Sequence, residues 1–156
     1  MLRGQEIVKK RDDIIKALNQ ALAAEGLAAY RYLYLAEWVS GHGAHEAKEI
    51  FTEMAEDEWG HVGKLLARIV QLGGTPVASP ADWEKHSFEK YKAPPKDASK
   101  LAQILEDSLE AERAAISFYQ ELAHKTQHED FVTFQLISGI LADEVEDEHT
   151  LDTFAR

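Results

Sequence analysis

The 156-residue sequence contains no cysteine, only four prolines and no long apolar run. Without cysteine the chain cannot form disulfides, iron–sulfur clusters or thiol-based catalytic sites. No window approaches the apolar length that a membrane span requires, and the N-terminal segment lacks the apolar stretch of a signal peptide. These absences predict a cytoplasmic protein without a membrane partner.

Basic residues are also few, because 17 Lys and Arg stand against 28 Asp and Glu, giving a formal net charge of -11. Contact with nucleic acid requires clustered positive charge, so this composition argues against direct DNA binding. The basic residues concentrated at positions 3–11 are followed at once by Asp12 and Asp13. An acidic surface of this kind favours attraction of cations.

The residues that dominate instead are Ala, Leu, Glu and Lys, and apolar positions recur every three or four residues. This periodicity is typical of helices. We expect four long helices, over about residues 5–39, 44–72, 97 or 99 to 125, and from 129 onward. The chain is therefore predicted to be a single all-α domain, residues 1–156, built as a four-helix bundle.

The connection between the second and third helices, "GGTPVASPADWEKHSFEKYKAPPKD", is far too long for a tight turn. Its length of about 25 residues is enough to cross the bundle from one end to the other. Ser79 as N-cap and Pro80 at the first helical position predict a short helix inside this crossover. Four helices with one long crossover form the topology of ferritin-like folds.

Four glutamates and two histidines stand out as candidate metal ligands: Glu25, Glu58, His61, Glu112, Glu146 and His149. Two of the glutamates begin Glu-x-x-His pairs, and the first pair lies within an apolar helix face. The other two glutamates lie among small or apolar residues on the first and third helices. The sequence around Glu25 also aligns with that around Glu112, which indicates a duplicated helical hairpin.

The spacings predict that these side chains meet at one level of the bundle. Glu25 and Glu58 are 33 residues apart across one predicted turn, and Glu112 and Glu146 are 34 apart across the other. Residues equidistant from a turn between antiparallel helices lie at the same height. Four unpaired carboxylates there would repel one another, whereas two divalent ions would balance their charge. Oxygen ligands with imidazole favour iron or manganese over zinc alone.

Other readings stay open at several positions. A single Glu-x-x-His usually marks a solvated helix face, and the metal interpretation depends on having two, each with a level-matched glutamate. Tyr32 and Tyr119 each lie seven residues after a candidate ligand, where they either contact the ligands or serve as core aromatics. The remaining histidines are expected at the surface: His42, His45, His86, His124 and His128.

At the six candidate ligands the chain resembles ferritin-like di-iron proteins, and bacterioferritins in particular. The resemblance implies a ferroxidase that oxidises two Fe(II) per chain with peroxide or oxygen, storing iron in a protein shell and protecting against oxidative stress. Haem-binding bacterioferritins place Met directly after the second-helix glutamate, where this chain has Trp59, so we expect no haem.

The C-terminal end and the long crossover resemble a second group within the same superfamily. Only seven residues follow His149, which leaves no room for the fifth helix of bacterioferritins. The long crossover is similar to that of Dps proteins, so the whole resembles the Dps-like ferritins and implies a homo-oligomer, a hollow dodecamer. Such a shell would bury an apolar flank formed by Trp59, Leu66 and Val70. An acidic stripe would face its cavity, formed by Glu49, Glu53 and Glu56.

Two other enzymes on the same bundle compete with the ferroxidase. Rubrerythrin-like peroxidases carry a further glutamate three residues after the third-helix ligand, where this chain has Ala115, and a cysteine-dependent iron domain that this chain cannot form. A di-manganese catalase stays open, because the ligand set alone does not separate manganese from iron.

Overall fold

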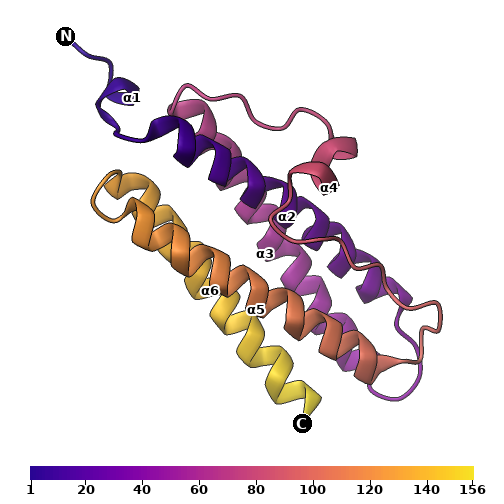
Figure 1. Ribbon diagram of the computed structural model, residues 1–156. Helices are drawn as coiled ribbons and strands as arrows, with labels where there is room; N and C mark the ends of the chain where they lie inside the picture. Colours follow the sequence, from indigo (N-terminus) through magenta and orange to yellow (C-terminus); the bar gives the residue numbers. More distant parts are fainter.

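The computed structural model describes all 156 residues, and two antiparallel helix pairs make up its bundle (Figure 1). In the first pair α2 (Arg11–Trp38) packs against α3 (Ala44–Gln71), and in the second α5 (Leu101–Thr126) packs against α6 (Phe131–Ala155). Three short elements complete the structure: α1 (Gly4–Ile7), the 3-10 helix η1 (Pro80–Asp82) and α4 (Trp83–His86). The predicted all-α four-helix bundle with a helix in its crossover is confirmed. None of the helices combines the length and apolar character needed to cross a membrane.

The first long helix begins later than the expected start at residue 5. Lys10 adopts a left-handed conformation with φ of 55° and separates α1 from α2. Asp12 and Asp13 then occupy the first turn of α2, where acidic side chains complement the helix dipole. The apolar periodicity did not register this break, because the charged residues 9–13 carry no core position.

The third long helix also begins later than expected, at Leu101 rather than at residue 97 or 99. The Asp97 carboxylate accepts hydrogen bonds from the backbone N–H of Ser99 at 2.9 Å and from its hydroxyl at 2.6 Å. These bonds close a turn ahead of the helix instead of capping its first residues, which is the competing use of Asp and Ser near helix ends.

The crossover leaves the end of α3 and runs along the outside of α2 to the opposite end of the bundle (Figure 1). The Ser79 hydroxyl oxygen accepts from the backbone N–H of Ala81 at 3.2 Å, so Ser79 caps the short helix as predicted. The Trp83 ring then lies against Gly26 of α2, where a Cβ atom would come within 2.7 Å of the ring. Glycine at this position therefore allows the crossover to dock beside Glu25.

Two apolar clusters fill the bundle, one toward each end. The first includes Leu18, Leu65 and Ile137, and the second includes Leu35, Phe51, Ile104 and Leu151, all fully or almost fully buried. Burial of each such side chain contributes about 1.5–3 kcal/mol. On every long helix at least one buried charged or imidazole side chain lies between its members of the two clusters, so the clusters hold the helices around a polar layer at mid-height.

Candidate metal centre

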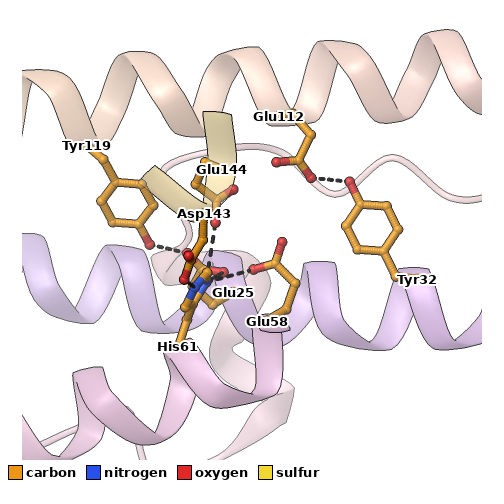
Figure 2. A network of polar contacts seen from close by, with 8 residues as sticks. All are labelled: Glu25, Tyr32, Glu58, His61, Glu112, Tyr119, Asp143 and Glu144. Carbon is orange, nitrogen blue, oxygen red and sulfur yellow. Dashed lines mark hydrogen bonds and ion pairs between the residues drawn. The ribbon is translucent and has the colours of Figure 1, made fainter. Parts of the chain in front are cut away.

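Six buried side chains form the polar layer: Glu25, Glu58, His61, Glu112, Glu144 and Asp147. One comes from α2, two from α3, one from α5 and two from α6. On α3 and α6 the two residues lie three apart, which places them on one helix face. The layer therefore draws on all four long helices, and Figure 2 shows its side chains other than Asp147.

The first group of possible ligands surrounds the His61 ring. Ligand atoms of Glu25, Glu58, His61 and Glu144 all lie within 4.8 Å of one another. The Nδ1 atom of His61 is 3.4 Å from Glu25 and 3.3 Å from each of the other two carboxylates. Its Nε2 atom lies 2.8 Å from the Asp143 carboxylate, which fixes the orientation of the ring (Figure 2).

The second group contains only carboxylates, those of Glu58, Glu112 and Asp147, with ligand oxygens again within 4.8 Å of one another. Glu58 belongs to both groups, so its two oxygens are placed to bridge two ions. Two carboxylate oxygens of the layer, Glu112 Oε2 and Asp147 Oδ2, are buried without any hydrogen-bond partner, and the only partner of Glu144 Oε1 is the His61 ring at 3.3 Å. Unsatisfied buried oxygens are costly, and divalent cations would satisfy them.

The electrostatics of the layer show the cost of holding these groups together without a cation. Burial and the charge of Glu25 raise the pKa of Glu144 to about 7, and burial and the charge of Asp57 raise the pKa of Asp147 to about 7. Burial together with the charge of Glu144 raises the pKa of Glu112 well above its ordinary value. Carboxylates forced together in this way retain protons that a metal ion would displace.

His61 responds in the opposite sense. Burial alone would lower its pKa, but the hydrogen bonds with Glu144 and Glu25 outweigh burial and raise its pKa to about 11. The protonated imidazolium therefore supplies positive charge where a metal ion would otherwise stand. Metal binding through Nδ1 requires this proton to leave.

Two buried tyrosines tie the halves of the layer together. The Tyr32 hydroxyl of α2 donates to Glu112 of α5, and the Tyr119 hydroxyl of α5 donates to Glu25 of α2 (Figure 2). Burial and the adjacent carboxylates raise the pKa of both phenols well above the ordinary value, so both remain protonated donors. Each tyrosine also belongs to one of the two apolar clusters.

The structure corrects the sequence prediction on α6. Glu146 and His149 are exposed and lie outside the polar layer, whereas Glu144 and Asp147 lie within it. Because each residue advances about 100° around a helix, a shift of two positions turns a side chain to the opposite face. The glutamate of α6 that lies in the layer with Glu112 is therefore Glu144, and not Glu146 as the spacing predicted.

The core-facing stripe of α6 contains a different pair, Glu144 and Asp147. Its buried members recur at steps of three and four from Ile137 through Ile140, Glu144 and Asp147 to Leu151. Continuing this apolar stripe would have reached Glu144 and Asp147. The Glu-x-x-His motif instead selected Glu146 and His149, each two residues further along the helix. These two residues repeat the spacing of the α3 pair but are exposed.

The other four predicted ligands, Glu25, Glu58, His61 and Glu112, are brought together by the structure. The five histidines expected at the surface are all exposed, as is the acidic stripe of Glu49, Glu53 and Glu56. The apolar flank on α3 is exposed in the single chain, with Trp59 at 43% and Val70 at 61%.

A bundle of this topology with a buried layer of carboxylates and imidazole belongs to the class of ferritin-like helical bundles. Residues 15–156 match the ferritin-like domain, and the chain is therefore a member of the ferritin-like family. Among its relatives is a DNA protection during starvation protein of Pyrococcus furiosus, 28% identical over 88% of this chain and 74% of the relative. A bacterial non-heme ferritin of Staphylococcus epidermidis is 25% identical over 90% of this chain and 80% of the relative.

Solved structures agree with this assignment. A dodecameric thioferritin, the bacterioferritin-related protein of Bacteroides fragilis, superimposes with a TM-score of 0.89 and 34% identity, covering 93% of this chain and 85% of the other. Dps from Thermosynechococcus elongatus superimposes with a TM-score of 0.86 and covers 93% of this chain and 91% of the other, and at 18% identity this likeness shows the fold.

Proposed function

We propose that the protein is a ferroxidase that takes two Fe(II) ions as substrate within one chain. The observation that carries this proposal is a layer where one imidazole and five carboxylates converge, with buried oxygens of Glu112 and Asp147 left without a hydrogen-bond partner. Membership of the ferritin-like family supports iron storage and protection against oxidative stress as the setting.

The donor set assigns two different binding positions. The first would be held by Glu25, His61 and the shared Glu58, with Glu144 within reach, and the second by Glu58, Glu112 and Asp147. This assignment replaces the predicted ligands Glu146 and His149. Hard oxygen donors with a single imidazole suit Fe(II) or Mn(II) better than softer ions.

The electron balance follows from two ions side by side. Each Fe(II) gives up one electron; a peroxide molecule accepts both, its O–O bond breaks, and two hydroxides result. If oxygen is the oxidant, the same two electrons with two protons yield hydrogen peroxide. The chain's own residues contribute by holding the two ions within reach of one oxidant and by releasing the protons of His61 and the carboxylates as the ions bind.

The test is Fe(II) oxidation by purified protein with peroxide or oxygen as the only oxidant. We expect fast oxidation that saturates at two Fe(II) per chain, followed by slower accumulation of Fe(III) that stays soluble with the protein. Saturation at one ion per chain, or oxidation no faster than in buffer, would refute the proposal.

A second function is supported by the same oxygen-rich donor set, which suits Mn(II) equally well. A di-manganese catalase would convert two peroxide molecules into oxygen and two waters without net oxidation of the metal. Oxygen evolution by Mn(II)-loaded protein, absent from the Fe(II)-loaded form, would favour this function over iron storage.

We further propose a dodecameric shell. One structural relative is named as dodecameric, and the exposed apolar flank on α3, Trp59, Leu66 and Val70, offers a surface that assembly would bury. Twelve copies of the 17.5 kDa chain weigh about 210 kDa, which native mass spectrometry separates from a dimer or a 24-subunit cage. One relative is named for DNA protection, but the net charge of -11 argues against direct DNA binding by this chain.

A further inference from the structure

A cavity of about 510 Å³ lies beneath the crossover, between α2 and α5, and extends inward to the metal centre. Its inner end is lined by Glu25, Glu58, Glu112 and Glu144. Small side chains on the two facing helices leave the space open: Ala24, Ala28, Ala111 and Ala115. The crossover residues 87–93 form its outer wall.

The outer wall is fixed at both of its ends. Phe88 stacks on Phe118 of α5 with ring centroids 4.1 Å apart. At the other end the Lys92 ammonium lies 2.7 Å from the Asp107 carboxylate and 3.0 Å from that of Glu110. The cavity is therefore a formed space under an anchored segment.

Arg31 lines this cavity and is only 5% exposed. Its Nε donates to the Lys92 carbonyl at 3.0 Å, and its Nη1 donates to the Ser108 hydroxyl oxygen at 2.9 Å. Because the Ser108 hydroxyl itself donates to the Ile104 carbonyl at 2.7 Å, this anchor is well defined. The second terminal nitrogen, Nη2, has no acceptor in the chain.

The Arg31 guanidinium forms no ion pair of its own, because Asp107, the carboxylate on which its charge acts, is paired with Lys92 at 2.7 Å. A buried charged donor without an acceptor is costly to a folded protein. Guanidinium groups favour oxyanions, whose oxygens accept charge-assisted hydrogen bonds. The missing partner of Arg31 is therefore an acceptor that enters the cavity from outside.

The charge of the layer determines when an anion can enter. Without metal, the layer carries protons on some of its carboxylates and on His61, and its remaining carboxylates repel anions; two divalent ions would instead place four positive charges at the inner end of the cavity. We propose that the cavity binds a small oxyanion of the phosphate or carboxylate class on Arg31 Nη2, and that this binding is coupled to metal occupancy. The coupling rests on the proposed function, and it places a source of oxygen ligands beside the oxidised iron.

The experiment is titration calorimetry with inorganic phosphate on metal-free protein and on protein loaded with Zn(II), which is redox-inactive, and then freed of excess metal. We expect one phosphate per chain, bound about 10-fold tighter in the loaded form, which lies within the usual range of coupling between sites. Arg31→Gln should weaken binding about 10-fold or more, as loss of a charge-assisted hydrogen bond requires. Lys90→Gln, which removes an exposed charge at the same cavity, should leave the affinity within about threefold.

A second variant leaves every Arg31 bond in place. Ala111→Leu fills the cavity and should abolish phosphate binding while helical content and metal stoichiometry remain unchanged. In Co(II)-loaded protein the paramagnetic centre should broaden the phosphorus resonance of bound phosphate, and Arg31→Gln should remove that broadening. Parallel titrations with sulfate and with acetate distinguish a site for tetrahedral oxyanions from a site for carboxylates.

Absence of phosphate, sulfate and acetate binding in both forms, or equal binding by wild type and Arg31→Gln, would overturn the anion site and leave Nη2 to water. Failure of Zn(II) to bind at two per chain would count against the proposed function instead. If Zn(II) does not bind, the metal-free protein still tests the anion site. Phosphate binding that is present in wild type and lost in Arg31→Gln would then support the anion site and refute its coupling to metal.

Discussion

The two helical hairpins of the molecule are built on one plan but differ at one decisive position. The first contributes Glu25, Glu58 and His61 to the polar layer, and the second contributes Glu112, Glu144 and Asp147 at corresponding places. An imidazole on α3 is thus matched by a carboxylate on α6. The two hairpins place these side chains at one level, while the exchange of His for Asp makes the two proposed metal positions chemically unequal.

The inequality extends to the neighbouring acids. The His61 ring has a carboxylate partner outside the layer, because its Nε2 lies 2.8 Å from Asp143. The relation is repeated in reverse between the hairpins, since the charge of Asp57 on α3 contributes to the raised pKa of Asp147 on α6. An acid therefore accompanies a base beside the first group of ligands, and an acid accompanies another acid beside the second. The second position should accordingly depend more strongly on a bound cation.

The largest expected effect comes from the residue that the two positions share. Glu58→Ala removes a ligand from both groups, so rapid Fe(II) oxidation should fall by more than the roughly 10–100-fold that loss of an outer partner costs. Metal analysis should show both ions lost together while helical content persists.

The matched controls test the correction on α6. Glu146→Ala and His149→Ala change exposed side chains outside the layer and should keep two ions per chain and full activity. Glu144→Ala, which removes a carboxylate from the group around His61, should instead weaken metal binding. Loss of metal in the His149→Ala protein would restore the original prediction and contradict the arrangement described above.

The pH response should separate the two hairpins. The pKa values of Glu144 and Asp147, about 7, exceed their ordinary values of 4.5 and 3.8. The folded protein therefore holds protons that the unfolded chain has released, and the melting temperature of metal-free protein should fall as pH rises from about 4 to 7. The pKa of His61, raised from 6.5 to about 11, extends this decline over the higher range.

Two changes sharpen this expectation. Asp147→Asn should flatten the decline below pH 7 and leave the part due to His61 above it. Saturation with Mn(II) should reverse the slope near neutrality, because metal competes with protons for the same atoms. A melting temperature that does not vary with pH in the metal-free protein would refute the proton sharing inferred for the layer.

A smaller effect should follow when the two positions are made alike. Asp147→His gives the second position an imidazole, and Co(II) or Zn(II) should then bind there about 10-fold tighter, following the preference of these ions for nitrogen. The Co(II) absorption spectrum should change at the second equivalent of metal while the first stays as in wild type. An unchanged spectrum at both equivalents would show that residue 147 does not contact metal.

The sequence predicted most of the fold because apolar periodicity and turn chemistry act locally. Ser79 and Pro80 specify the crossover helix by their own hydrogen bonding and backbone preference, and the four long helices follow from their apolar stripes. The break at Lys10 was missed because a left-handed residue among charged neighbours leaves no mark on that periodicity.

The metal layer was predictable where packing and motif agreed and failed where they competed. On α3 the Glu-x-x-His pair and the apolar stripe coincide, so Glu58 and His61 were correctly placed in the buried layer. On α6 the buried stripe contains Glu144 and Asp147, each two residues before the corresponding member of the Glu-x-x-His motif. Arg31 gave no signal at all, since its unpaired charge arises only when the crossover covers it.

The smallest expected effect concerns the two tyrosines, which cross between the hairpins. Tyr32 donates to Glu112 in the all-carboxylate group, and Tyr119 donates to Glu25 in the group that contains His61. Phenylalanine at either position keeps the packing, since Tyr32 stacks on Phe51 and Tyr119 contacts Phe118 through ring faces and edges. Each substitution therefore removes a single hydrogen bond, worth about 1 kcal/mol or about fivefold in metal affinity.

The direction of each change is specific to one position. Tyr119→Phe should weaken binding of the Co(II) ion that carries the nitrogen ligand, and Tyr32→Phe should weaken the all-oxygen ion, each leaving the other within about twofold because separate contacts act independently. Titrations followed by the Co(II) spectrum resolve the two ions through that difference in ligands. If both variants weakened the same ion, the tyrosines would act on the layer as a whole, and the division into two unequal positions would have to be abandoned.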